Sequence, residues 1–173
     1  IGDKSLAKRD FSRVTEPLRL FGAKIKSYNG KLPVKILGSK FLRPINYFEN
    51  IGSAQCKSSV MLASLKVPGI TKIKAKKSRN HTELLFKTLG LPIKIIQKKN
   101  YDYFSLKGEN NFKSFNYRIP GDISSCSFFI VLTILSNNSR LTIKNVNINK
   151  SRTGIISILN KMNAKIKFKN IKS

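Results

Sequence analysis

Two short runs of the sequence place small hydroxyl residues and a cation where a helix is expected to begin. The first is Gly-Ser-Ala-Gln-Cys-Lys-Ser at 52–58, and the second is Ser-Arg-Asn-His-Thr-Glu at 78–83. A helix start leaves several backbone N–H groups without a partner and carries a partial positive charge, so it readily binds phosphate or carboxylate. We therefore expect these two helix starts to hold a small anionic ligand from two sides.

Each run also has a purely structural interpretation. Ser53 is a common type of N-cap, which stabilises a helix by ~1 kcal/mol without binding a ligand. Asn80 and Glu83 have the spacing of a capping box. Arg79 favours the ligand interpretation, because its planar guanidinium matches the geometry of a phosphate. His81 is more typical of a hydrogen-bonding residue at a helix start than of a catalytic acid or base.

The charge of the chain is strongly positive and widely spread. The 173 residues include 34 Lys and Arg against 8 Asp and Glu, a formal net charge of +26. This balance is typical of nucleic-acid-binding proteins, but the lysines occur in every segment, and abundant Lys, Asn and Ile are also what an AT-rich genome encodes. No zinc-finger spacing, glycine–aromatic RNA-binding motif or basic zipper is present. We expect no nucleic-acid partner, although a basic nucleic-acid-binding module is one alternative.

Cysteine content, histidine content and hydropathy exclude several other classes of protein. Cys56 and Cys126 lie far apart without ligand-spaced partners, and His81 is the single histidine. This pattern predicts reduced thiols, with neither a disulfide framework nor a metal site. No apolar run approaches the ~20 residues that span a bilayer, so no membrane association is expected. The chain starts at Ile1 without a leader pattern, and we expect it to begin inside a longer protein.

Hydrophobic periodicity predicts alternating helices and strands along the whole chain. One helix is expected from about residue 15, because Pro17 suits only a first turn. Further helices are expected at about 53–67, 82–89, 124–136 and 153–162, with 128–135 as a buried face and Asp122 and Ser124 as caps. Strands are expected at 23–26, 32–36, 70–74, 93–96, 101–106, 115–119, 140–146 and 164–168, with a hairpin turn at 29–30.

One joint between a helix and the next strand recurs three times, at Gly22, Gly90 and Asn163. Each of these residues follows a helix C-terminus, where Gly or Asn takes the left-handed conformation. Repetition at the similar spacings between Gly22, Gly90 and Asn163 predicts stacked α/β units.

Three motifs together resemble the 5-enolpyruvylshikimate-3-phosphate synthase family, the 3-phosphoshikimate 1-carboxyvinyltransferases. They are Gly-Asp-Lys-Ser-Leu-Ala-Lys-Arg at 2–9, Ser-Ala-Gln followed by Lys-Ser within 53–58, and Ser-Arg-Asn-His-Thr-Glu at 78–83. The resemblance implies an α/β fold of repeated βαβαββ units, the inside-out α/β barrel of the enolpyruvyltransferases, which is incomplete here. It also implies that residues 1–119 are the latter part of the first domain, and that 120–173 begin the repeat unit that enters the second domain.

The resemblance also implies roles for the motif residues. Asn80 replaces an aspartate of the family motif, and Asp10 follows Arg9 where the family has proline, which predicts a weaker hold of Arg9 on its ligand. No catalytic residue is expected within this chain, and neither a metal nor a cofactor is implied. Shikimate 3-phosphate is expected to contact Ser53, Ala54, Gln55, Ser78 and Arg79, and phosphoenolpyruvate is expected to contact Arg9 and Gln55.

The implied activity is transfer of the enolpyruvyl group of phosphoenolpyruvate to the 5-hydroxyl of shikimate 3-phosphate, in the shikimate pathway to chorismate and the aromatic amino acids. The resemblance implies a cytoplasmic enzyme that is monomeric when complete and acts on these small anions. The chain alone is expected to be inactive, because the family's Lys-Ser-x-x-x-Arg segment and its C-terminal acidic and basic residues are absent. A UDP-N-acetylglucosamine enolpyruvyltransferase-like enzyme, with the same fold and type of reaction, is the second alternative.

The effect of the dispersed positive charge on DNA binding can be tested in solution. Duplex DNA is expected to bind the chain weakly and without sequence preference, because phosphate contacts alone provide the affinity, and binding is expected to fall steeply with added salt. Titration of labelled duplexes of two unrelated sequences at several salt concentrations measures both properties. Sequence-specific binding that persists at physiological salt would contradict the enzyme interpretation.

Overall fold

The computed structural model describes residues 3–108, 111 and 113–171. The chain forms two compact units, residues 1–113 and residues 114–173, each with its own set of elements. None of the described helices has the length and apolar composition required to cross a membrane.

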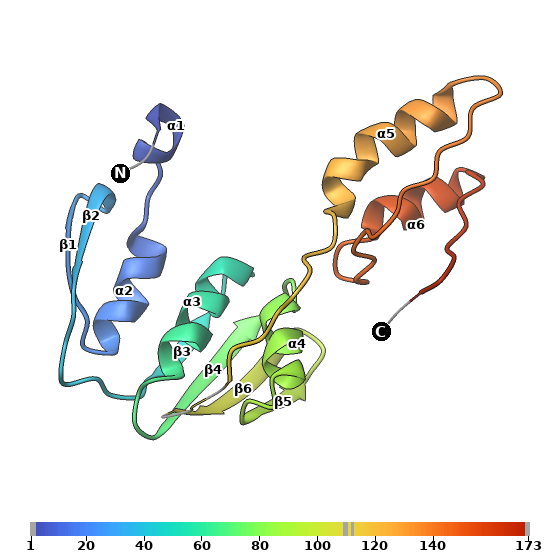
Figure 1. Cartoon of the computed structure of the whole chain (residues 1–173). Coiled ribbons are helices and arrows are strands. Elements are labelled where there is room, and N and C mark those ends of the chain that lie inside the picture. The colour runs from blue at the N-terminus through green and yellow to red at the C-terminus, as the bar shows by residue number, and fades with distance from the viewer. Residues whose placement is uncertain (1–2, 109–110, 112, 172–173) are drawn as a thin grey trace. The chain divides into compact units, whose positions relative to one another are not determined.

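The first unit begins with two helices and a β-hairpin (Figure 1). Its elements are α1 (Lys4–Ala7), α2 (Ser12–Leu20), β1 (Lys24–Tyr28) and β2 (Lys31–Leu37). The predicted hairpin is confirmed, because β1 and β2 pair antiparallel and the two turn residues, Asn29 and Gly30, have φ of 46° and 70°. Positive φ at both central residues is what a type I′ turn requires. The Phe11 N–H donates to the Gly30 carbonyl at 2.7 Å, which ties this turn to the start of α2.

Helix α2 begins earlier than the sequence predicts. It starts at Ser12 instead of near Thr15, and Pro17 lies inside it. The Asp10 carboxylate accepts a hydrogen bond from Ser12 N at 2.8 Å, which satisfies one of the N–H groups that a helix start leaves open. An interior proline removes one hydrogen bond from the helix. Pro17 is buried, so packing of its ring offsets part of that loss.

The rest of this unit is a four-stranded sheet covered by two helices. The strands lie in the order β3-β4-β6-β5, with β3 parallel to β4 and the other two pairs antiparallel. Helices α3 and α4 lie over the same side of the sheet (Figure 1). All these elements except β3 are predicted. Their bounds are β3 (Asn46–Glu49), α3 (Ala54–Ser64), β4 (Ile70–Lys76), α4 (His81–Thr88), β5 (Ile93–Gln97) and β6 (Tyr101–Lys107).

The core of this unit forms between the sheet and the two helices. Strand β4 alternates between buried residues such as Ile73 and exposed lysines such as Lys74, so the two faces of the sheet differ in chemistry. Ile73 belongs to one hydrophobic cluster with Phe104 of β6, Met61 of α3 and Phe86 of α4. Burial of each large apolar side chain contributes about 1.5–3 kcal/mol. The cluster therefore fixes both helices, and the residues at their N-terminal ends, against the sheet.

The second unit contains helices α5 (Ile123–Leu135) and α6 (Gly154–Lys161). Asp122 caps α5 as predicted: its carboxylate accepts from Ser124 N at 3.1 Å and pairs with the Arg152 guanidinium at 2.8 Å. The hydrogen bond from Arg152, followed by that from the Ser124 backbone, holds the pKa of Asp122 below its usual value. The start of α5 is therefore anchored to the loop that precedes α6.

Three predicted strands in this unit are wrong. Residues 115–119, 140–146 and 164–168 form no strand, and an isolated parallel bridge joins Gly121 to Val146. Apolar alternation indicates which face of a strand can be buried. A strand also needs a neighbouring strand for its backbone N–H and C=O groups, and none is available within the described part of this unit.

The apolar side of α5 also differs from the prediction of a buried face at 128–135. Phe128 and Leu135 are each 78% exposed, and Ile123 is the buried residue of the helix. The apolar segment forms the predicted helix, but burial of its apolar side requires a second surface to pack against.

The backbone geometry of the recurring joint is confirmed. Gly22, Gly90 and Asn163 have φ of 105°, 66° and 63°. The first two lead into β1 and β5, whereas residues 164–171 after Asn163 form no strand. A left-handed residue after a helix is a local property of the sequence, and pairing of the strand that follows it is not.

Gly108 provides a test of the packing between α3 and the sheet. A Cβ at this position would lie 1.6 Å from the Val67 carbonyl oxygen and 2.7 Å from the Ser64 carbonyl oxygen. Because backbone atoms cannot move aside as a flexible side chain can, Gly108→Ala is expected to lower the free energy of unfolding by about 2–3 kcal/mol. Gly38→Ala is the matched control, since its Cβ would meet no atom within 4 Å. Chemical denaturation measures both variants, and equal stabilities would contradict this packing.

Candidate anion-binding site

The first of the two motif runs forms the start of helix α3. Ser53 is the N-cap, and its Oγ accepts a hydrogen bond from Cys56 N at 3.3 Å. Ala54 and Gln55 are the first two helical residues, so their N–H groups belong to the set without a partner inside the helix. The capping role of Ser53 is confirmed, and the amides beside it face the N-terminal side of the helix, where anions bind.

A buried carboxylate binds the backbone of the loop that leads into this helix start. Glu49, the last residue of β3, is 1% exposed and accepts hydrogen bonds from the N–H groups of Ile51, Gly52 and Ser53 at 3.0, 2.9 and 3.0 Å. Charged acceptors make strong hydrogen bonds, so these three bonds fix the backbone conformation of this loop. Glu49 was not predicted as a residue of this site; its signal in the sequence is an acidic residue shortly before a Gly-Ser helix start.

The second run forms the start of helix α4. Asn80 is the N-cap, but its side chain makes no capping hydrogen bond, and Glu83 contacts Lys57, so the predicted capping box is wrong. The side chain of Arg79 is exposed. Ser78 Oγ is buried and has no hydrogen-bond partner among the residues that the structure describes. This loop therefore offers a free cation and a hydroxyl whose hydrogen-bonding capacity is unused.

Lys57 joins the two helix starts. Its ammonium group lies 2.5 Å from Glu83 Oε1 and donates to the Arg79 carbonyl oxygen at 2.9 Å. Beside this contact, the hydroxyl groups of Ser58 and Thr82 lie 2.6 Å apart. Runs that are distant in the sequence therefore adjoin in the fold. Lys57 does not add its charge to the ligand side, as the sequence suggested, because it is paired internally.

Arg9 lies on a different segment, between α1 and α2, with its side chain exposed. The link from this segment to the start of α3 is Arg13, whose guanidinium donates to Gln55 Oε1 at 3.4 Å. Arg13 was not predicted as a site residue. Its signal is a second arginine one helical turn after Arg9, on a helix that packs against α3.

The carboxylate of Asp10 is directed to the start of α2. The backbone N–H of Ser12 and then the Ser12 hydroxyl hold the pKa of Asp10 below its usual value, and the charge of Arg13 contributes further. Arg9 and Asp10 form no ion pair in the described part of the chain. The predicted weakening of Arg9 by Asp10 therefore has no direct contact behind it.

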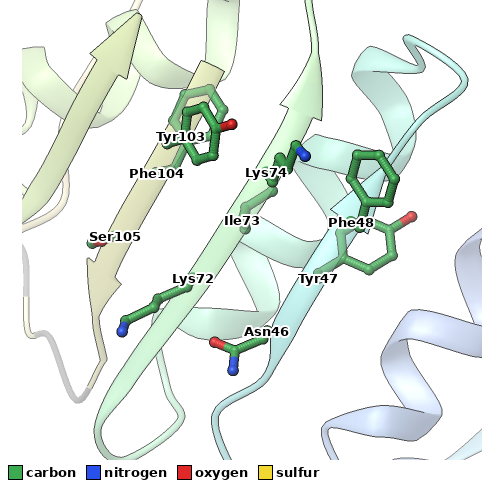
Figure 2. A pocket seen from close by; sticks show the side chains of 9 residues that line it. All are labelled: Asn46, Tyr47, Phe48, Lys72, Ile73, Lys74, Tyr103, Phe104 and Ser105. Carbon is green, nitrogen blue, oxygen red and sulfur yellow. The ribbon is translucent and has the colours of Figure 1, made fainter. Parts of the chain in front are cut away.

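A separate hollow of about 340 Å³ lies on the face of the sheet that α3 and α4 do not cover, among residues of β3, β4 and β6 (Figure 2). The Lys74 ammonium lies 4.8 Å from the ring centre of Phe48 and 4.9 Å from that of Tyr101. These cation–π contacts occupy the ring faces and stabilise the outer side of the sheet. None of the predicted site residues lines this hollow, so it is distinct from the two helix starts.

Comparison with known proteins identifies the family. The family model described as EPSP synthase (3-phosphoshikimate 1-carboxyvinyltransferase) matches residues 1–173. The chain belongs to the EPSP synthase family. The 3-phosphoshikimate 1-carboxyvinyltransferase of Caldicellulosiruptor bescii is 42% identical over 175 residues, covering 99% of this chain and 40% of that protein. The corresponding protein of Geobacillus kaustophilus is 39% identical and matches 100% of this chain and 40% of its own length.

Solved structures support the same assignment. An EPSP synthase from Acinetobacter baumannii superposes with a TM-score of 0.81 at 37% identity, over 98% of this chain and 38% of that chain. The predicted family and α/β fold are thus confirmed, and they are favoured over the UDP-N-acetylglucosamine enzyme and the nucleic-acid-binding module. The sheet is mixed and forms no closed barrel among the described residues. The chain spans about 40% of the length of the relatives it matches.

The division into domains at 119 and 120 and the assignment of individual residues to ligands stay predictions. The cytoplasmic location, the monomeric state and the absence of a nucleic-acid partner also stay predictions. The structure places Ser53, Ala54 and Gln55 at one helix start and Ser78 and Arg79 at the other, and it joins these two groups through Lys57.

Glu49 provides a test of how the first helix start is held. Glu49→Gln keeps the side-chain volume but replaces a charged acceptor by a single neutral carbonyl, so it is expected to lower the free energy of unfolding by about 2 kcal/mol. Amide exchange of Ile51, Gly52 and Ser53 is expected to accelerate with it. Hydrogen-exchange NMR measures these amides, and exposed Glu16→Gln on α2 is the matched control. Unchanged exchange at all three amides would contradict the role given to Glu49.

Proposed function

We propose that this chain is the central segment of a 3-phosphoshikimate 1-carboxyvinyltransferase. The enzyme transfers the enolpyruvyl group of phosphoenolpyruvate to the 5-hydroxyl of shikimate 3-phosphate and releases inorganic phosphate. The observation that carries the proposal is the joining of two motif-bearing helix starts, because Lys57 of α3, which Ser53 caps, contacts the Arg79 carbonyl. Family membership supports the same reaction.

The phosphate of shikimate 3-phosphate binds between the two helix starts. Ser53 Oγ and the N–H groups at the start of α3 supply neutral donors, and Arg79 supplies a planar cation with two parallel donors. Ser78 Oγ supports this placement, because a buried hydroxyl without a partner gains a hydrogen bond when a phosphate oxygen arrives. Gln55 faces the ring of the same substrate.

Phosphoenolpyruvate binds through Arg9, with Gln55 between the two substrates. The hydrogen bond from Arg13 to Gln55 supports this arrangement, since it links the segment that carries Arg9 to the start of α3. Arg9 is exposed and therefore available to an anion. Two arginines and two helix starts on one unit suit a reaction whose substrates are both anions.

The chain contributes binding and orientation to the reaction. Addition of the 5-hydroxyl to phosphoenolpyruvate forms a tetrahedral intermediate, and elimination of phosphate completes the transfer without a metal or an organic cofactor. Holding both anions in reactive orientation lowers the barrier through proximity and charge stabilisation. The groups that move protons lie outside this segment, so the segment alone is inactive. The complete enzyme acts in the cytoplasm as a monomer, on small anions and not on nucleic acid.

Arg79 and Ser53 test whether the two helix starts share one phosphate. A charge-assisted contact contributes about 1.5–3 kcal/mol. Arg79→Ala in the full-length enzyme is therefore expected to weaken the binding of shikimate 3-phosphate about tenfold to a hundredfold. Ser53→Ala removes a neutral hydroxyl and is expected to weaken it less. The affinity for unphosphorylated shikimate is expected to change little in either variant. Calorimetric titration of both ligands measures the difference.

Thermal melts separate binding from stability in these variants, because Ser53→Ala also removes a helix cap. Arg140→Ala is the matched control for Arg79→Ala, since Arg140 is an exposed arginine of the second unit. Equal losses for phosphorylated and unphosphorylated ligand would show that these residues do not contact the phosphate.

A further inference from the structure

Two deeply buried charges, those of Lys57 and Glu83, lie beside the proposed phosphate site. The side chains of Lys57 and Glu83 are 2% and 6% exposed, and the two form an ion pair. Lys57 Nζ also lies 5.5 Å from the centre of the Phe104 ring, on the helix-covered side of the sheet. Both charges are therefore removed from water, within the hydrophobic layer under α3 and α4.

Stability alone is a poor explanation for this pair. A buried ion pair loses the hydration of both charges, and replacing it with well-packed apolar side chains is often neutral or stabilising. Glu83 Oε2 is buried and has no hydrogen-bond partner among the described residues, so the pair is not fully compensated. An apolar pair of similar volume would join α3 to α4 equally well.

The third contact of the group distinguishes the pair from an ordinary core interaction. Lys57 Nζ donates to the carbonyl oxygen of Arg79 at 2.9 Å. Arg79 is the exposed cation of the second motif run, and Ser78 precedes it. Lys57 itself lies in the first turn of α3, two residues after Gln55. One ammonium group thus ties the backbone of one ligand-binding run to the helix start that carries the other.

We propose that Lys57 and Glu83 are positioning residues, which fix the Ser78–Arg79 loop at the distance from the start of α3 that one phosphate requires. The inference rests on the proposed function. Glu83 orients the Lys57 ammonium and balances its charge, and Lys57 holds the Arg79 carbonyl. Neither side chain contacts the substrate, because both are buried beneath the loop.

The test removes the pair without leaving a buried charge. In the full-length enzyme, the double variant Lys57→Met with Glu83→Leu is expected to melt near the wild-type temperature. Its KM for shikimate 3-phosphate is expected to rise about tenfold to a hundredfold, as displacement of a binding group by about 1 Å does. Its KM for phosphoenolpyruvate is expected to change less than about twofold, because Arg9 does not depend on this contact.

Two further variants control for stability. Val60→Ala opens a cavity in α3 at a residue that is 0% exposed, and it is expected to lower the melting temperature without changing either KM. Glu83→Gln keeps a hydrogen-bonding partner for Lys57, so its effect on shikimate 3-phosphate is expected to be smaller than that of Lys57→Met alone. A KM that follows melting temperature across the set, or the reverse order of these two variants, would refute the positioning role.

The outcomes also separate this inference from the proposed function. Wild-type full-length protein that neither binds shikimate 3-phosphate nor turns it over would refute the proposed function, and the inference with it. An active wild-type enzyme together with a double variant of unchanged KM would refute the positioning role alone.

Discussion

The buried contact between Lys57 and Glu83 joins the two motif runs of this chain through the core. Breaking such a pair leaves an uncompensated charge in the core, at a cost of about 3–5 kcal/mol, which is a large share of the stability of a typical domain. Helices α3 and α4 therefore cannot separate without this loss. Because the same ammonium group holds the Arg79 carbonyl, the distance between the two motif runs is set by the core and not by the loops themselves.

Burial and packing divide the cations of this chain into three kinds. Lys57 lies inside and is paired, whereas Arg9, Arg13 and Arg79 are exposed. A third group, typified by Lys74, lines the outer face of the sheet and packs on aromatic rings. The net charge of +26 contains all three kinds and by itself indicates no site. The proposed anion-binding region is distinguished by an exposed arginine, Arg79, and free helix amides, not by the total charge.

The two units show how far local patterns determine structure. In residues 1–113 the alternation of β4 meets partner strands on both sides, so the pattern becomes a sheet with a buried and an exposed face. In residues 114–171 the same kind of alternation produces no strand, and the apolar side of α5 is exposed. Helices form in both units because their hydrogen bonds are internal. Strands form only where a neighbour completes their ladder.

The sequence by itself determined the family, the helices other than α1, the hairpin at Asn29 and Gly30, and which two runs carry the candidate site. The family follows from the resemblance of three motifs, and the helices and the hairpin follow from caps, turn residues and hydrophobic periodicity within a few positions of one another. Only the tertiary structure showed that Glu49 holds the first helix start, that Glu83 pairs with Lys57 instead of closing a capping box, and that Arg13 reaches Gln55. The physical reason is that Glu83 and Arg13 take partners from another element, and that the chain after Glu49 turns back onto its buried carboxylate. Such a choice depends on which surfaces the core brings together and on which charges it removes from water, and neither is encoded in local spacing.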